Sequence, residues 1–402
     1  MEKETEITTS IEVPTKVWNA QFISIFIASI CVYLSLQLGH TMVPKYVYSL
    51  GGTAAIIGTI SGAFGATAFI MKVFSGPMID TLNRKYVFMA AAGGLVLAMV
   101  GYSLSTSIPM LFVSRLLQGA AQTFTAVCML TMVADTLPPD KMGQGIGIYW
   151  MAQAFAQAIG ASLGLELVAK VGYKGTFLIA GAMAALAILL ATRIQLNFKR
   201  TKEFKISLQG IAAKEALLPS VVIFLLSAVF ININTFLVID AGLKGLSSSV
   251  VGVYFTTYAV MMLVSRPLVG KLSDMFGFIK SAIPVMCIYA GGFVILSFAT
   301  TWWMYCAAGV MIAFGWGAAL PIIQALAIKT VPKDRRGAAT NAGYIGMDFG
   351  NMLGPVVAGI VADRLGYMVM WQSLVVPVGL AVIFALVNAK RINTIESNFV
   401  KN

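Results

Sequence analysis

The chain alternates between long apolar runs and short polar connections over almost its whole length. An α-helix needs about 20 mostly apolar residues to cross the hydrocarbon core of a bilayer. Twelve runs reach that length, at about 20–45, 51–75, 87–106, 109–134, 143–169, 174–193, 216–240, 248–269, 281–300, 302–328, 337–362 and 368–389. This pattern predicts an all-α integral membrane protein with twelve transmembrane helices.

A basic segment divides the runs into two sets of six. It contains Lys199, Arg200, Lys202, Lys205 and Lys214. We expect a tail at 1–19, a six-helix bundle at 20–193, a basic cytosolic linker at 194–215, a second six-helix bundle at 216–389 and a tail at 390–402. The linker could also form an amphipathic helix on the membrane surface.

The composition agrees with a lipid environment. The chain is 58% hydrophobic and only 11% charged, with a mean hydropathy of +0.85, whereas about 25% of the residues in a soluble domain are charged. A net charge of +12 would suggest nucleic acid as the partner of a soluble protein. Here we expect the cations to mark membrane topology, and no nucleic-acid partner.

The cations gather on one side of the predicted membrane. With an even number of spans, both termini share a side, and that side holds Lys3, Lys16, Arg84, Lys85, Lys141, the linker cations, Lys271, Lys280, Lys333, Arg335, Arg336, Lys390, Arg391 and Lys401. The opposite side holds Lys45, Lys170, Lys174, Lys244 and Arg364. The positive-inside rule therefore places both termini in the cytosol of a multi-pass protein of the plasma (inner) membrane.

The second half of the chain repeats landmarks of the first at a displacement of 194 residues. The repeated positions are Gly76 and Gly270, Asp80 and Asp274, Lys72 and Arg266, Pro138 and Pro332, Gly160 and Gly354, and Gly172 and Gly366. A constant offset without gaps predicts two parallel six-helix repeats. Parallel repeats place a substrate site between them near the middle of the bilayer.

The first repeated polar segment resembles a cytosolic loop signature of the major facilitator superfamily. Gly76, Asp80, Arg84 and Lys85 carry that match. Two further similarities are Arg115, Gln118 and Gly119, which resemble the superfamily's fourth-helix motif, and Gly160 and Gly164, which resemble the fifth-helix motif of its drug–proton antiporter branch. The resemblance covers nearly the whole chain and implies a secondary transporter that works by alternating access.

The resemblance also implies a gate at the cytosolic ends of the helices. We expect Asp80 to accept hydrogen bonds from free N–H groups at the start of the eleventh helix, near Gly337, where a helix dipole favours negative charge. Gating candidates are Gly76, Asp80, Arg84, Lys85 and the repeated Asp274. The alternative is that Asp80 is a solvated loop carboxylate.

Charged residues inside the predicted spans are the candidates for proton coupling or substrate binding. Asp348 lies about eleven residues into its run, and a lone carboxyl group at such depth favours its neutral form. Arg115 lies roughly two turns inside the fourth run, where the resemblance implies a coupling or anchoring cation; it could instead snorkel to the interface. Glu166, Asp240 and His40 lie nearer the external ends, as interfacial groups or external relays.

Polar and aromatic residues within the runs are the candidates for a substrate cavity. They are Tyr33, Gln37, Gln118, Gln122, Gln153, Gln157, Asn232, Asn234, Phe236, Trp316 and Tyr344. Each aromatic side chain could equally pack between helices or face lipid. The 22 methionines suit an adaptable apolar pocket or ordinary lipid-facing positions.

Several classes of function lack their motifs. There is no Gly-rich loop ending in Gly-Lys-Ser/Thr for a nucleotide, and the four cysteines and the single histidine form no metal-ligand pattern. We therefore expect no cofactor, no metal and no enzyme activity. The sequence favours a monomeric, proton-coupled exporter of small amphipathic or drug-like molecules, whose partners are the substrate, protons and the bilayer. A proton symporter that imports a metabolite, or a membrane sensor without transport, remain as alternatives.

Overall fold

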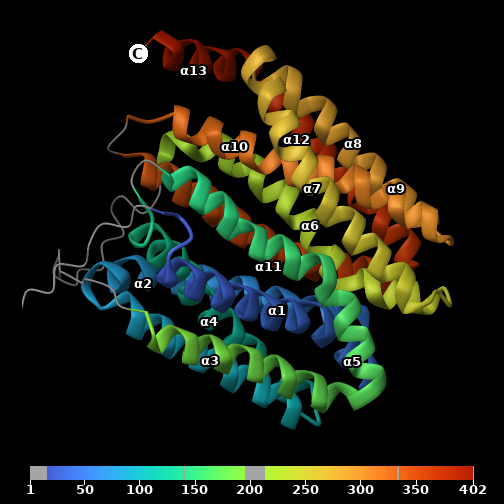
Figure 1. Ribbon diagram of the computed structural model, residues 1–402. Coiled ribbons are helices and arrows are strands. Elements are labelled where there is room, and N and C mark those ends of the chain that lie inside the picture. Colours follow the sequence, from blue (N-terminus) through green and yellow to red (C-terminus); the bar gives the residue numbers. More distant parts are fainter. Residues whose placement is uncertain (1–15, 139–140, 195–212, 333–334, 402) are drawn as a thin grey trace, which may run out of the picture.

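The described residues are almost entirely helical and contain no strand. The computed structural model describes residues 16–138, 141–194, 213–332 and 335–401; at Gly76, Pro77, Ile79, Asp80, Gly143, Ser248, Gly337 and 398–401 it describes the backbone alone. Its first helices are α1 (Ala20–Ser49), α2 (Ala54–Thr81), α3 (Arg84–Leu104), α4 (Ile108–Asp135) and α5 (Met142–Thr192). Figure 1 shows these five helices as one group.

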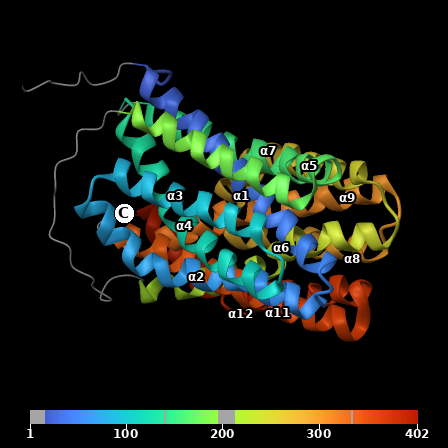
Figure 2. The ribbon, with the colours of Figure 1, turned by 90° about the horizontal axis from the view of Figure 1, so that it is seen from below.

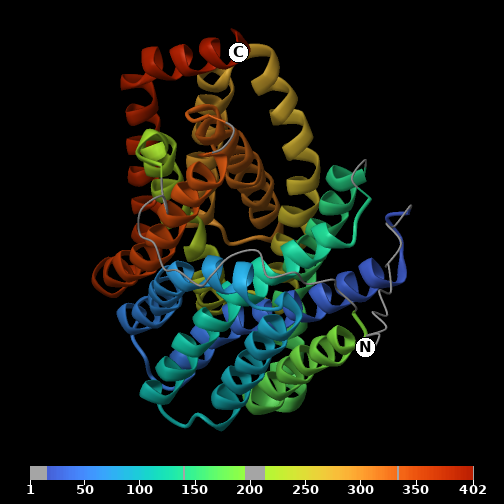
Figure 3. The same cartoon turned by 90° about the vertical axis from the view of Figure 1, so that its left-hand side faces the viewer.

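The remaining helices form the second group, on the other side of the molecule (Figures 1 and 3). They are the 3-10 turn η2 (Lys214–Ala216), α6 (Leu217–Leu243), α7 (Ser248–Phe276), α8 (Phe278–Phe298), α9 (Trp302–Ile312), the π-helical turn η3 (Ala313–Gly317), α10 (Ala318–Lys329), α11 (Arg336–Ser373), α12 (Val375–Val387) and α13 (Ala389–Lys401). We call the end of the molecule where α1 begins and α2 ends the proximal end, and the opposite end the distal end.

Ten helical stretches in the described residues are long and apolar enough to cross a membrane. Two of them, 144–192 and 338–387, have 49 and 50 residues, more than twice the length that one span requires. Each contains one glycine with a positive φ, Gly172 at 69° and Gly366 at 83°. Only glycine adopts this conformation readily, so the chain turns sharply there. Each long stretch joins two of the expected runs, and the count of twelve spans stays a prediction.

The polar segments that join consecutive helices are shorter than the sequence predicts. The second predicted run ends at residue 75, but α2 continues through Gly76 and Pro77 to Thr81, and only Leu82 and Asn83 separate it from α3. Similarly, α7 continues to Phe276, and Gly277 alone makes the turn, with φ 81°. A proline costs a helix little near its end, where few backbone hydrogen bonds remain to be lost. The expected tail at 390–402 is also largely helical, as α13.

Four helix pairs join the two groups: α2 with α11, α5 with α7, α1 with α6 and, over a short stretch, α2 with α6. In Figure 2, α2 and α11 lie side by side. Gly58 and Gly62 of α2 face the main chain of Pro355 and Met352 of α11 so closely that an added Cβ would collide with it. Small residues permit such close approach of two helix backbones, and this glycine seam sets which faces of α2 and α11 meet.

Candidate functional site

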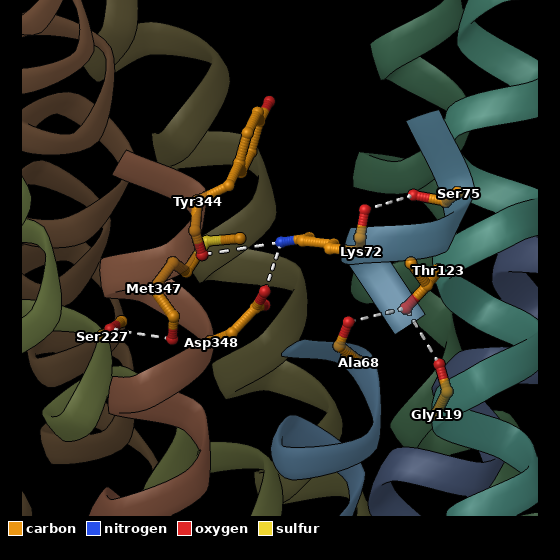
Figure 4. Close-up of polar contacts among 9 residues, drawn as sticks. All are labelled: Ala68, Lys72, Ser75, Gly119, Thr123, Ser227, Tyr344, Met347 and Asp348. Carbon is orange, nitrogen blue, oxygen red and sulfur yellow. Dashed lines mark hydrogen bonds and ion pairs between the residues drawn. The ribbon is translucent and has the colours of Figure 1, made fainter. Parts of the chain in front are cut away.

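A buried ion pair crosses the boundary between the two helix groups. The Nζ atom of Lys72 on α2 lies 2.5 Å from Oδ2 of Asp348 on α11 (Figure 4). Asp348 is only 4% exposed. Lys72 lies nine residues before the end of α2 and Asp348 twelve residues after the start of α11. At ~1.5 Å per residue, both lie about 14–18 Å from the proximal end. The sequence led us to expect a lone carboxyl group at Asp348, but the structure pairs it with Lys72.

Neighbouring contacts hold the lysine in this position. Its Nζ also lies 3.5 Å from the carbonyl oxygen of Tyr344 and 5.0 Å from the centre of the Tyr344 ring. Figure 4 shows the lysine reaching across from α2 toward both residues of α11. A cation over an aromatic ring gains attraction that grows when water is excluded. Tyr344, a predicted cavity residue, is therefore a second contact of the Lys72 ammonium group, after Asp348.

Each helix that carries the ion pair is also fixed to its own group. The Thr123 hydroxyl of α4 donates to the Ala68 carbonyl of α2 at 3.4 Å. The Ser227 hydroxyl of α6 donates to the Met347 carbonyl of α11 at 3.2 Å. Figure 4 shows both contacts flanking the ion pair. A movement that separates α2 from α11 at this level would therefore break the Lys72–Asp348 contact.

A second buried polar cluster lies within the first group, around Arg115. This guanidinium is 2% exposed and seven residues from the start of α4, about 10 Å from the distal end. It donates to Oε1 of Gln118 at 2.7 Å and to Nδ1 of His40 at 3.3 Å. Tyr102 donates to the same Gln118 oxygen at 2.7 Å. The side chain packs inward and does not snorkel to the surface.

The hydrogen bonds of His40 define its tautomer. Because Nδ1 accepts from Arg115, Nε2 carries the proton and donates to Oε1 of Gln122 at 3.1 Å. Phe64 covers this arrangement, with its ring centre 4.7 Å from the imidazole and 5.0 Å from the guanidinium. Arg115 forms no ion pair with any described carboxylate. A buried cation without a counter-ion is costly, and such residues usually have a functional role.

At the distal end, Asp363 joins the two groups in a way that the sequence analysis missed. Its two carboxylate oxygens accept from the backbone N–H groups of Ala54 and Ala55, at 2.6 and 2.9 Å. A carboxylate on α11 thereby caps the free N–H groups at the start of α2, where the helix dipole favours negative charge. The sequence does show an acid, Asp363, three residues before Gly366. In this segment the charge distribution had used only the neighbouring cation Arg364.

Other contacts between the groups lie in the distal half. Gln37 of α1 donates to Asn234 of α6 at 3.2 Å, and the Thr256 hydroxyl of α7 donates to the Ala158 carbonyl of α5 at 3.3 Å. The structure thus brings together the predicted cavity residues Gln37 and Asn234. Tyr33 lies within its own group and shares a 2.6 Å hydrogen bond with Tyr149.

The expected gating residues have separate partners. Arg84 forms an ion pair with Asp135, and Lys85 donates to the carbonyls of Thr192 and Ile194 at 2.8 and 2.9 Å. Asp274 is exposed. The surroundings of Gly76, the side chain of Asp80 and the expected contact near Gly337 lie outside what the structure describes, so this gate stays a prediction.

The remaining acids differ in their surroundings. Asp240 is 3% exposed and accepts from Trp371 at 2.9 Å and Lys244 at 3.0 Å, which makes it a buried junction between α6 and α11. Glu166 is exposed, and its place at the membrane interface stays a prediction.

Three predicted cavity residues pack against helices. Asn232 is fully buried, and its amide donates to the Ala228 carbonyl of its own helix. Phe236 is fully buried against Tyr367. Trp316 stacks on Phe230 with 4.9 Å between ring centres. Gln153 and Gln157 are half-buried on α5. In the described residues, no group of three His, Cys, Asp or Glu side chains could hold a metal ion.

Comparison with known proteins identifies relatives along nearly the full length. The sequence profile of the Major Facilitator Superfamily matches residues 25–243 and 219–397. An uncharacterized MFS-type transporter of Methanocaldococcus jannaschii is 24% identical over 87% of this chain and 92% of its own. A multi-drug resistance efflux pump PmrA homolog of Lactococcus lactis is 24% identical over 93% of this chain and 96% of its own.

Solved structures share the fold at lower identity. The nucleoside transporter NupG superposes with a TM-score of 0.76 at 13% identity, over 93% of this chain and 98% of its own. A POT family transporter in complex with 5-aminolevulinic acid gives a TM-score of 0.77 at 14% identity, over 92% and 96% of the two chains. At these identities the likeness establishes the arrangement of helices alone.

Proposed function

Since this chain belongs to the Major Facilitator Superfamily and is therefore a multi-pass secondary transporter and not an enzyme, we propose that it exports small amphipathic or drug-like molecules in exchange for protons. The export direction is supported by relatives described as a multi-drug resistance efflux pump homolog, a multidrug resistance protein and a staphylopine export protein. The nucleoside and POT transporters share only the fold of this chain. The alternative function is import of a metabolite together with protons.

The proposed topology has twelve spans in two parallel repeats. Gly172 and Gly366 each divide one long helical stretch into two spans, and these two glycines are themselves separated by the 194-residue repeat. The positive-inside rule then makes the proximal end cytosolic. Both termini lie on that side, and the protein acts as a monomer, since each chain contains both repeats.

The Lys72–Asp348 ion pair is the observation that carries the proposal. When Asp348 is ionised, its attraction to Lys72 holds α2 and α11 together. When Asp348 takes up a proton, that attraction is lost, and Lys72 remains a cation in a poorly polar site. Since the ion pair joins the two groups, one proton changes the free energy of their contact, which is the requirement for coupling a proton to a conformational change.

Contacts at the distal end fit the same cycle. The Asp363 cap, the glycine seam and the Gln37–Asn234 hydrogen bond all join the groups in the distal half. In the proposed topology this conformation is closed toward the outside. Asp80 would make the reciprocal contact with the start of α11 when the cytosolic side is closed.

The Arg115 cluster is the second proposed site of proton coupling or substrate binding. His40 and Gln122 extend the cluster from the buried guanidinium toward the middle of α4. His40 accepts from the guanidinium through Nδ1, and a substrate with a hydrogen-bond acceptor could replace His40 as a partner of Arg115. Tyr33 and Gln37 offer further polar groups on α1, close to the boundary between the repeats.

Reconstituted vesicles test this function. The full chain in proteoliposomes under an imposed pH gradient should move a lipophilic cation such as ethidium in the direction opposite to the proton. Movement of a nucleoside or peptide together with the proton would favour the importer. If no compound of a broad panel moves, the chain is a sensor and the export proposal fails.

A further inference from the structure

An apolar groove runs along the outside of the molecule between α6 and α11. Its volume is about 720 Å³, within the ~300–1,000 Å³ of typical ligand sites. Its walls include Leu217, Val221 and Phe224 of α6, and Phe349 and Leu353 of α11. Leu217, Phe349 and Leu353 are all exposed, and the buried Asp348 lies on another side of α11. The groove therefore faces the lipid.

The dimensions of the groove match one leaflet of a bilayer. It extends along η2 and α6 from Lys214 to Phe224. Ten residues of helix rise about 15 Å, which is half of the ~30 Å hydrocarbon thickness. The groove begins at the proximal end and ends near the middle of the membrane.

A single cation lies at the open end of this groove. Lys214 is exposed and lines its mouth. The neighbouring carboxylate of Glu215 is engaged by both terminal nitrogens of Arg335, at 2.8 and 3.4 Å. Among the described residues no hydrogen bond or ion pair occupies the Lys214 ammonium group. A positive charge is thus left free at the level where lipid headgroups lie.

The interior of the groove offers almost no polar group to a ligand. The Ser220 hydroxyl, which lies on the wall, already donates to the Ala216 carbonyl at 2.7 Å. A transported substrate needs polar partners that fix its orientation, whereas an acyl chain needs only apolar contact. The combination of an apolar channel one leaflet long and one cation at its mouth fits a lipid.

We propose that this groove binds an anionic phospholipid of the proximal leaflet. One acyl chain lies along Val221, Phe349 and Leu353, and the phosphate group is next to Lys214. This site is separate from the proposed transport pathway and depends only on the membrane location of the chain. Because Phe349 directly follows Asp348 and packs on Phe69 of α2 with 4.7 Å between ring centres, the bound lipid touches the helix that carries the ion pair.

Native mass spectrometry of the purified full chain tests the site, with phosphatidylglycerol and phosphatidylcholine of identical acyl chains added in separate titrations. The wild type should bind one phosphatidylglycerol more tightly than any phosphatidylcholine. Lys214→Ala should weaken phosphatidylglycerol binding roughly fivefold, as expected for one cation near an anionic headgroup, and leave phosphatidylcholine binding unchanged. Lys280→Ala, which removes another exposed cation of the second group, should change neither.

Two substitutions that fill the groove provide the second arm. Val221→Trp and Leu353→Trp lie on opposite walls, and each should abolish the tight phosphatidylglycerol site in monodisperse protein. The proposal is overturned if Lys214→Ala binds phosphatidylglycerol as tightly as the wild type, or if both filled variants keep the site. Competitive displacement of the lipid by ethidium would also overturn it, because the groove would then belong to the substrate.

Discussion

At the scale of single residues, the structure assigns partners that the sequence left open. Asp348 was a candidate because of its depth within its apolar run, and the structure shows it buried, with 4% of its surface exposed. Its partner Lys72 could not be predicted, because the glycine seam decides which face of α2 meets α11, and that choice depends on both helices together. Asp363 was missed for a similar reason, since a capping carboxylate is recognised only when the helix that it caps is known.

The ion pair predicts a characteristic pattern of stability. Asp348→Asn or Lys72→Gln alone leaves one buried polar group without its partner and should lower the free energy of unfolding by about 2 kcal/mol, since Lys72 retains some solvent. The double variant should recover most of that loss. Thermal unfolding in detergent, followed by tryptophan fluorescence, measures the effect. Additive losses in the double variant would show that the two side chains do not interact.

The distal cap predicts an effect on conformation. Asp363→Asn weakens the contact with the N–H groups of Ala54 and Ala55 by about 1 kcal/mol, which should increase the population open at the distal end about fivefold. Labelling of a cysteine introduced at Ala54, which is 6% exposed beside the cap, in a background without the four native cysteines, reports that opening. Asp135→Asn, which removes an acid at the proximal end, serves as the control. Equal labelling rates in all three proteins would show that the cap does not hold this end closed.

At the scale of helices, hydropathy predicted where spans lie far better than where helices end. The predicted run at 109–134 and α4 (Ile108–Asp135) differ by one residue at each end, because burial in lipid requires an uninterrupted apolar helix. The predicted run at 51–75 ends six residues before α2 does. Polar residues mark the edge of the bilayer, but the backbone hydrogen bonds continue beyond it until Leu82.

The glycine seam brings the backbones of α2 and α11 into close contact. A larger side chain in place of one of its glycines should prevent that close approach. Gly62→Leu would place a side chain against the main chain of Met352 and should reduce transport more than tenfold while the protein remains folded. Gly93→Leu on α3 is the matched control, because a Cβ there meets nothing within 4 Å. Transport rates in proteoliposomes compare the two. Equal rates would mean that close approach of these helices is not needed.

Helix α13 predicts a measurable contact at the proximal face. Glu396 accepts from the N–H of Phe278, at 3.0 and 3.2 Å, and pairs with Lys329 at 3.4 Å. Glu396→Gln should weaken this cap by about 1 kcal/mol and speed hydrogen exchange in the first turn of α8 about fivefold. Ser397→Ala, whose hydroxyl bonds only its own helix, should leave exchange unchanged, and an unaltered rate in Glu396→Gln would contradict the docking of α13.

At the scale of the whole molecule, the sequence predicted the helical membrane class and the family, and both are confirmed. The 194-residue repeat and the cation distribution predict two parallel repeats with cytosolic termini, and these remain proposals. How tightly the two groups touch could not be predicted, because it depends on the conformation that the protein adopts. The distal contacts and the proximal ion pair together describe one state of a cycle.

The topology has a direct test. A cysteine introduced at Tyr86, which is exposed beside Arg84, in the cysteine-free background should react with an impermeant reagent only in inverted vesicles. A cysteine at Thr53, at the distal end, should react from outside intact cells. The reverse pattern would overturn the assignment of the proximal end to the cytosol.

The central claim is that protonation of Asp348 couples the pH gradient to substrate movement. Its most direct test compares wild-type and Asp348→Asn protein in proteoliposomes, with ethidium accumulation under an imposed pH gradient and ethidium exchange without one. The wild type should accumulate ethidium against its gradient. Asp348→Asn should exchange ethidium at a comparable rate yet stop at equal concentrations on both sides. Full accumulation by Asp348→Asn would contradict the account.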